Sequence, residues 1–282
     1  MDLSIVIPTH HRPQILRRTL DHIEKQTVRE KLEVVVVSDG PDDRTAEMIQ
    51  NLSWSFPLQY FSIPKSQQGA ARNAGVQKAR GKIVLFIGDD IFLQKDACEK
   101  HLRTNEECRM KNGECAILGS TMWDPHVGIT PVMRWLEETG WQFGYSKIKK
   151  HAHDFIPPSL QHRFTYASHL SLPWKVANRF PFREDMTLYG WEDTEWGIRL
   201  RDAGIHLFYQ PDARSLHHHR IELNDSLTRM QTIGTSLRHM ETLIPAFDRI
   251  PRGWKWYAYR VISFLPTMRG RHCHALMKGL TK

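Results

Sequence analysis

Two adjacent carboxylates, Asp89 and Asp90, follow a run of five apolar residues over 83–87 and a single glycine. A short, continuous apolar run with β-branched residues is typical of a strand buried on both faces. Because charged residues are rarely buried, the aspartates are expected just beyond the end of that strand. Ligands bind there in open parallel sheets, and paired carboxylates suit a divalent cation that holds a phosphate. A polar connection from a strand to a loop, without any ligand, would explain the same residues. Other parts of the chain are therefore needed to distinguish the two interpretations.

Other carboxylates and histidines occupy comparable positions. Asp39 follows a second apolar run, where a turn or helix cap is the ordinary explanation. Glu192 and Asp193 begin a predicted helix, whose N-terminus favours ionised carboxylates in any case. The three histidines 217–219 are also compatible with a solvated turn. Together these groups fit a nucleotide diphosphate, a bridging metal and a base that takes a proton from an attacking hydroxyl. Arg72, in an Ala-rich helix, favours phosphate or base atoms, or lies on an exposed helix face.

Strands and helices alternate four times over residues 1–90. The apolar runs at 4–7, 32–37, 58–63 and 83–87 predict the strands. This alternation predicts an α/β fold with a parallel, doubly wound sheet and right-handed crossovers. A further helix is expected over 96–111 and a strand over 115–118.

The second half of the chain changes character. Residues 124–165 mix aromatic side chains with prolines, histidines and lysines, which predicts an irregular, aromatic-lined lobe. A helix over 192–203 and a short strand over 207–209 are expected to follow. The stretch 244–282 is both aromatic and basic, which suits a bilayer interface or, equally, a basic terminal helix docked on its aromatic face.

The composition and the absence of certain motifs limit which partners, locations and activities are expected. The 282 residues carry a formal net charge of +8, which favours an acidic partner such as a nucleotide or an anionic membrane. The basic residues are dispersed, so nucleic acid is not expected as a partner. No apolar run is long enough for a membrane span, and the apolar residues 4–7 are expected to form a first strand rather than part of a signal peptide. Four cysteines without a CxxC pair predict reduced thiols in a cytoplasmic protein. No GxGxxG follows the first strand, and neither a P-loop nor a GxSxG motif is present.

Several of these segments resemble those of family 2 glycosyltransferases, which have the GT-A fold. The resemblance covers roughly residues 3–220, and the motifs occur in the order and spacing of that family. Each motif alone is weak, but six in order are specific. The matching segments are 4–9 (SIVIPT), 34–40 (VVVVSDG), 69–75 (GAARNAG), 81–90 (GKIVLFIGDD), 190–195 (GWEDTE) and the histidine after 211–213 (PDA).

The resemblance implies a nucleotide site in the first half of the chain. Pro8 and Thr9 would line the base pocket, and Asp39 would contact the base or ribose. Arg72 would border the base, and Asp89 would lie near the ribose. The implied fold is a mostly parallel central sheet flanked by helices, with an acceptor lobe and a helical C-terminal extension.

The resemblance also implies the reacting groups. Asp90 would be the metal ligand, and His217 the further metal or diphosphate contact, with the choice between His217 and His219 left open. Asp193 would be the catalytic base, with Glu192 beside it. Two positions depart from the family pattern. Gly88 replaces the first carboxylate of the usual Asp-x-Asp, and His169 replaces an asparagine often found before the Leu-Ser segment.

The implied activity is that of an inverting, metal-dependent glycosyltransferase of the hexosyltransferase type. It would use Mn²⁺ or Mg²⁺ and a nucleotide-diphosphate sugar, with UDP favoured. The acceptor would be a hydroxyl of a glycan or lipid-linked saccharide in cell-surface polysaccharide or glycoconjugate synthesis. Alternatives are a nucleotide-sugar-binding protein without turnover and a nucleotidyltransferase.

The same resemblance implies the domain organisation. Residues 1–220 are expected to form the glycosyltransferase domain, with a nucleotide-binding half over 1–123 and an acceptor-binding half over 124–220. Residues 221–282 would form a helical, basic and aromatic extension. The expected location is cytoplasmic, with peripheral contact of the C-terminus at the inner face of the cell membrane.

Overall fold

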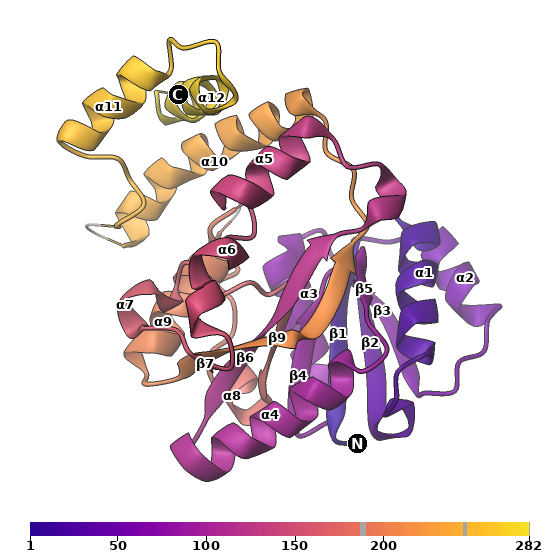
Figure 1. Cartoon of the computed structure of the whole chain (residues 1–282). Helices are drawn as coiled ribbons and strands as arrows, with labels where there is room; N and C mark the ends of the chain where they lie inside the picture. The colour runs from indigo at the N-terminus through magenta and orange to yellow at the C-terminus, as the bar shows by residue number, and fades with distance from the viewer. Residues whose placement is uncertain (187–189, 245–246, 282) are drawn as a thin grey trace.

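One mixed β-sheet, flanked by helices, organises the chain (Figure 1). The structure is a computed structural model and describes residues 1–186, 190–244 and 247–281. Among these residues the sheet has nine strands in the order β3-β2-β1-β4-β8-β6-β9-β5, and β7 pairs with β9. The strands are β1 (Leu3–Thr9), β2 (Leu32–Asp39), β3 (Leu58–Ile63), β4 (Ile83–Ile87), β5 (Ile91–Leu93), β6 (Cys115–Trp123), β7 (Asp154–Phe155), β8 (His169–Pro173) and β9 (His206–His217).

The first four strands are parallel, as the alternation of strand and helix predicts. Alternate residues of each strand enter two different hydrophobic clusters. On β4, Val84 and Phe86 belong to one cluster, whereas Leu85 and Ile87 belong to the other. This arrangement explains the continuous apolar runs, because both faces of the sheet are covered. The covering helices are α1 (Pro13–Glu24), α2 (Asp43–Gln50), α3 (Gln67–Lys78) and α4 (Ala97–Asn112), with the 3-10 turn η1 (Arg29–Lys31) before β2.

Helix α3 lies very close to the sheet because of a glycine. A Cβ on Gly75 would lie only 2.4 Å from Cγ1 of Val6 on β1. Any larger residue at position 75 would force the helix away from the strand. The close approach holds the first half of α3, which carries Arg72, over the carboxyl ends of the parallel strands.

The second half of the sheet is mixed. Strand β8 pairs antiparallel with both β4 and β6, and β6 pairs parallel with β9. Strand β9 is twelve residues long and continues through Pro211 to His217, so the short strand predicted over 207–209 was too short. The register of β6 against β9 shifts between Leu118 and Ser120, and this irregularity accommodates the additional residues of β9.

Short helices build the lobe and the edge beside β8. The lobe contains η2 (Pro125–Val127), α5 (Pro131–Thr139), α6 (Tyr145–Ile148), η3 (Lys149–His151) and α7 (Pro158–Gln161). Helix α8 (Trp174–Arg179) follows β8, and α9 (Glu192–Asp202) precedes β9. The irregular, aromatic character expected for residues 124–165 matches this part of the structure.

Three helices follow the sheet: α10 (Leu223–Leu243), α11 (Trp254–Ile262) and α12 (Met268–Leu280). Figure 1 shows them to one side of the sheet, with α11 and α12 beyond α10. Helices α10 and α12 meet at two glycines, Gly234 on α10 and Gly279 on α12. A Cβ on Gly234 would lie only 2.3 Å from the carbonyl oxygen of Leu276. None of the helices within the described ranges is long and apolar enough to cross a bilayer. The division of the chain at residue 220 stays a prediction.

Candidate functional site

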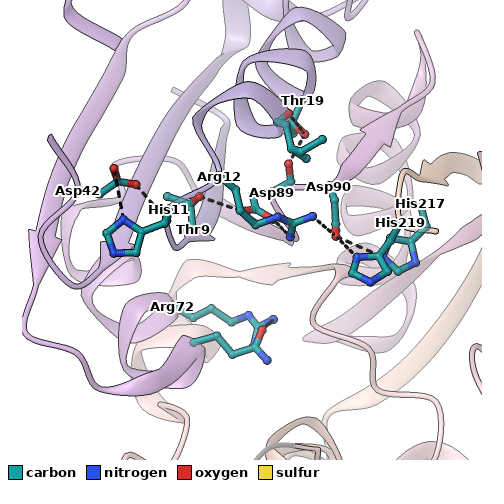
Figure 2. A network of polar contacts seen from close by, with 12 residues as sticks. Thr9, His11, Arg12, Thr19, Asp42, Arg72, Asp89, Asp90, His217 and His219 are labelled. Carbon is teal, nitrogen blue, oxygen red and sulfur yellow. Dashed lines mark hydrogen bonds and ion pairs between the residues drawn. The ribbon is translucent and has the colours of Figure 1, made fainter. Parts of the chain in front are cut away.

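Arg12 bridges the two carboxylates at the end of β4. Its Nη1 lies 2.7 Å from Oδ1 of Asp89, and its Nη2 lies 3.0 Å from Oδ2 of Asp90 (Figure 2). Thr9, at the end of the neighbouring strand β1, donates its hydroxyl to Oδ2 of Asp89 at 2.8 Å. Thr19 of α1 donates to the backbone carbonyl of Asp89 at 2.6 Å. The aspartates therefore lie beyond the buried strand, as predicted, and are held by residues of the first strand–helix unit.

Two histidines approach Asp90 from β9 and the residues after it. Nε2 of His217 lies 3.5 Å and Nδ1 of His219 lies 3.3 Å from Oδ2 of Asp90. One ligand atom from each of the three residues can be chosen so that all lie within 4.8 Å of one another. One carboxylate oxygen and two imidazole nitrogens are donor atoms that divalent transition metals accept. The residues therefore fit a metal ion at Asp90, His217 and His219.

The surroundings of the acidic pair shift the pKa values of the two aspartates in opposite directions. Burial, together with the neighbouring charge of Asp90, raises the pKa of Asp89 to about 6 although Arg12 opposes the shift. Burial also acts to raise the pKa of Asp90. Its hydrogen bonds with His217 and His219 outweigh this effect and hold the pKa of Asp90 well below its usual range. Asp90 is thus the carboxylate more strongly maintained in its ionised form, which is the form that binds a cation.

The middle histidine of the 217–219 run points to a different partner. Nδ1 of His218 lies 2.6 Å from Oδ2 of Asp124, a carboxylate that also contacts His126 at 2.7 Å. The backbone amide of His218 donates to the carbonyl of Asp90 at 2.8 Å. The contact of His218 with Asp124 and its amide bond to Asp90 fix the chain segment that carries His217 and His219.

Asp193, the predicted base, lies at the start of α9, and only one of its two carboxylate oxygens has a hydrogen-bond partner. Its Oδ2 accepts a hydrogen bond from the amide of Ala167 at 3.0 Å. Its Oδ1 is buried without a hydrogen-bond partner and lies 3.8 Å from Nη1 of Arg72. Burial and the charge of Glu192 raise the pKa of Asp193 to about 6, while Arg72 acts in the opposite direction. Because Oδ1 is buried and has no hydrogen-bond donor, a hydroxyl that reaches it within the site would find a free acceptor for its proton.

Arg72 and Glu192 are joined through one glutamine. Nη2 of the buried Arg72 donates to Oε1 of Gln68 at 2.9 Å, and Nε2 of Gln68 donates to Oε1 of Glu192 at 2.9 Å. Glu192 also accepts from the amide of Gly190 at 3.1 Å. The structure thus brings Arg72 to Asp193 and α9 and buries it, so it does not lie on an exposed helix face. The contact with the nucleotide base that the family resemblance implies stays a prediction.

Asp39 is engaged with the segment that begins α3. Its Oδ1 accepts from the amides of Ser66 and Gln67 at 2.6 and 3.1 Å, and its Oδ2 pairs with Nζ of Lys65 at 2.8 Å. Pro8 stands on β1 in register with Val37. Asp39 therefore has the ordinary structural role of anchoring a helix start. Its predicted contact with base or ribose is untested, as is the predicted role of Pro8.

His169 lies inside the sheet rather than at its edge. Its Nε2 is 3.1 Å from Nε2 of His101, and its Nδ1 is 3.0 Å from the hydroxyl of Ser215. His101 in turn contacts the hydroxyl of Ser171 at 2.8 Å. Burial lowers the pKa of His169 to about 3, so the ring is neutral. The residue at this departure from the family pattern thus forms part of a buried polar network that joins α4, β8 and β9.

Sequence reasoning missed Arg12 and Asp124. Arg12 lies three residues after Thr9, just beyond the first predicted strand, as Asp89 lies just beyond the fourth, and this shared position was an available signal. Asp124 carried no comparable signal, because its partner His218 lies 94 residues away in the chain.

Comparison with known proteins adds independent information. Residues 4–111 match the family model described as glycosyl transferase family 2. An uncharacterized glycosyltransferase of Bacillus subtilis, YfnE, is 27% identical over 259 residues, which is 77% of this chain and 64% of that protein. A GalNAc(5)-diNAcBac-PP-undecaprenol β-1,3-glucosyltransferase of Campylobacter jejuni is 30% identical over 41% of this chain and 38% of its own length. The chain spans less than two thirds of either relative.

Solved structures share the fold. The mannosyltransferase PcManGT of Pyrobaculum calidifontis, in complex with GDP-Man and Mn²⁺, superposes with a TM-score of 0.62 at 14% identity, covering 99% of this chain and 86% of that one. S. aureus TarS in complex with UDP gives a TM-score of 0.57 at 16% identity over 84% of this chain and 65% of that one. These likenesses confirm the predicted GT-A fold, with a sheet that is mixed in its second half.

Proposed function

We propose that this chain, which belongs to glycosyl transferase family 2, transfers a sugar from a nucleotide-diphosphate sugar to an acceptor hydroxyl with inversion at the anomeric carbon. The observation that carries the proposal is the meeting of Asp90, His217 and His219 beyond β4. The parallel strands β1, β2 and β4 end at the same edge, where doubly wound sheets bind their ligands.

The donor side is built to hold a diphosphate. Asp90, His217 and His219 would hold Mn²⁺ or Mg²⁺, and the bound ion would neutralise charge that develops on the departing nucleotide diphosphate. Thr9 and Arg12 keep Asp89 oriented beside this site. UDP is favoured as the nucleotide. TarS was solved with UDP and with UDP-GlcNAc, although PcManGT was solved with GDP-Man.

The acceptor side centres on Asp193. Its unpaired Oδ1 would take the proton of the acceptor hydroxyl as the hydroxyl oxygen attacks the anomeric carbon from the face opposite the diphosphate. The bond between the anomeric carbon and the diphosphate oxygen breaks as the new glycosidic bond forms, and the proton stays on Asp193. A single displacement of this kind needs no covalent intermediate with the protein.

The acceptor that we propose is a glycan or lipid-linked saccharide bound against the 124–170 lobe. The Campylobacter relative is named for a undecaprenol-linked acceptor, which supports this class. We place the reaction in cell-surface polysaccharide or glycoconjugate synthesis at the cytoplasmic face of the membrane. No nucleic acid takes part in it.

Asp193→Asn tests the proposed base. Removing a general base costs roughly 10²- to 10⁴-fold in rate. We therefore expect release of UDP from a panel of UDP-sugars, with Mn²⁺ and saccharide acceptors, to fall by at least about a hundredfold. Calorimetric binding of UDP should remain within about twofold, because Asn keeps the hydrogen bond from Ala167.

Asp202→Asn, an exposed change on the same helix, is the matched control and should keep full turnover. Retained turnover in Asp193→Asn would contradict the assignment of the base. If the wild-type protein bound UDP but turned over no sugar nucleotide, a binding protein without turnover would replace the proposed enzyme.

A further inference from the structure

The positive charge of the chain is concentrated at its C-terminal end. Residues 249–282 contain eight lysines and arginines and no aspartate or glutamate. Residues 1–248 contain 31 basic and 31 acidic residues, so the net charge of +8 arises entirely from the last 34 residues. This segment includes α11 and α12.

Helix α11 exposes aromatic and aliphatic side chains on one face. Trp254, Tyr257 and Val261 are 75%, 68% and 67% exposed. At about 100° per residue these three positions fall within roughly 60° of one another around the helix. Phe264, in the turn after α11, is 79% exposed. Five of the eight large apolar side chains that are exposed in the described ranges lie between residues 254 and 265, so they form a concentrated patch.

The opposite face of α11 is already used for packing. Trp256 and Tyr259 pack against the hydrophobic cluster of α10 and α12. The outward residues are therefore not required to attach the helix to the protein. The exposed Lys255 and Arg260 lie on the two flanks of the apolar stripe, at about 130° and 90° from its centre. An apolar stripe flanked by cations is typical of helices that lie in a membrane interface.

We infer that α11 and the turn after it form a docking surface for anionic membranes. Trp254, Tyr257, Val261 and Phe264 would enter the interfacial layer, where Trp and Tyr are enriched. The lysines and arginines of residues 249–282 would contact anionic phospholipid headgroups. This inference names the surface by which the protein reaches a lipid-linked acceptor, but membrane binding itself does not depend on turnover.

The docking surface is joined to the predicted acceptor lobe. The ring of His272 on α12 lies 4.5 Å from the ring of Trp135 and 5.8 Å from the ring of Trp141. His272 also contacts the hydroxyl of Ser226 on α10 at 2.8 Å. A membrane bound at α11 would thus be connected through α12 to the lobe at which we place the acceptor.

Two other occupants are less consistent with this surface. A second copy of the chain would place two segments without acidic residues, each strongly positive, against one another. Single-stranded nucleic acid would suit aromatic and basic residues, but the stripe has the periodicity of a helix face that inserts into an apolar layer.

The test is co-sedimentation of the full chain with vesicles of phosphatidylcholine alone or with 30 mol% phosphatidylglycerol, a composition chosen for the assay. We expect binding to the anionic vesicles that is weakened by high salt, and little binding to the neutral ones. The triple variant Trp254→Ser, Tyr257→Ser, Phe264→Ser should lower partitioning by about tenfold. Lys255→Ala with Arg260→Ala should weaken binding to anionic vesicles only.

The matched control replaces exposed methionines that lie outside residues 249–282, Met110→Ser and Met122→Ser, and should bind as the wild type does. Melting temperature and calorimetric UDP affinity should be unchanged in all variants, because every altered side chain is exposed. Equal binding of the triple variant and the wild type would overturn the inference. It would also be overturned if the full chain failed to bind anionic vesicles, or if the triple variant only abolished self-association or oligonucleotide binding. UDP affinity and turnover are measured separately, so failure of membrane binding would leave the proposed enzyme intact.

Discussion

The side chains around Asp193 set its protonation through two opposing charges. Arg72 approaches the open oxygen at 3.8 Å and favours the carboxylate, whereas the neighbouring Glu192 disfavours it. Burial has the largest effect, in the same direction as Glu192, and the balance raises the pKa of Asp193 to about 6. A base with this pKa is deprotonated at neutral pH and still basic enough to accept a proton from a hydroxyl.

This balance predicts shifts of the pH–rate profile in opposite directions. The acid limb of kcat/KM should lie near pH 6, because only the ionised Asp193 can accept a proton. Arg72→Gln removes the charge that lowers the pKa of Asp193, so the limb should move to higher pH by about one unit. Glu192→Gln removes the charge that raises it, so the limb should move to lower pH. Steady-state rates of UDP release from pH 5 to 8 measure both shifts.

Arg201→Gln provides the control for a charge lost from α9 away from Asp193, and its acid limb should coincide with that of the wild type. Melting temperatures of all three variants separate a pH effect from loss of folding. A limb that moved in the same direction in Arg72→Gln and Glu192→Gln would show that a group other than Asp193 controls the rate.

Among the elements, the parallel strands were the most predictable. The runs that form β1, β2 and β4 are apolar at consecutive positions because alternate side chains enter the two clusters on opposite faces. The place of Asp89 and Asp90 beyond β4 followed from the same pattern, since a buried strand cannot contain them. Local sequence therefore carried enough information to predict both the strand and its acidic end.

Long-range pairing was not predictable in this way. Arg12 meets Asp89 across 77 residues, and no periodicity marks such a contact. Strand β8 lies antiparallel between β4 and β6. Tertiary packing determines this position and direction, because the five residues of β8 do not specify them. The strand predicted over 207–209 was too short, because the register shift between Leu118 and Ser120 of β6 lets β9 continue to His217. That continuation is what brings His217 to Asp90.

The contact of α10 with α12 makes a prediction about stability. A Cβ on Gly279 would lie 2.1 Å from the carbonyl oxygen of Gln231 and 2.9 Å from Cα of Gly234. Gly279→Ala must therefore separate the two helices, and overpacking of this kind costs about 1–3 kcal/mol. Alanine has the higher helix propensity, so a lower melting temperature in Gly279→Ala would reflect packing alone.

Lys278→Ala, on the exposed side of the same helix, should change the free energy of unfolding by less than about 0.5 kcal/mol. Urea unfolding followed by circular dichroism measures both changes. A Gly279→Ala protein as stable as the wild type would mean that α10 and α12 can move apart without loss of contact energy.

Across the whole molecule, the site unites parts of the chain that are distant in sequence. Asp90 comes from the end of β4, His217 from the end of β9, and Arg12 from the start of α1. A ligand that binds all of these segments binds only the folded chain, so it stabilises the folded state against unfolding. Stability is therefore a measure of binding at this site that does not require a known sugar or acceptor.

Metal-dependent stabilisation by UDP is the prediction at this scale. At a ligand concentration of about 100 times Kd, binding contributes about 2.7 kcal/mol, or about 5 °C in melting temperature for a chain of this size. UDP with Mn²⁺ should raise the melting temperature of the wild type more than UDP with EDTA does. Asp90→Ala and His219→Ala should remove the metal-dependent increment, because each lacks one donor of the three that converge. Asp96→Ala, an exposed aspartate paired with Lys100, should keep the full increment. If Asp90→Ala retained it as well, the metal would have to bind through other residues, and Arg12 would then be the permanent partner of the two aspartates.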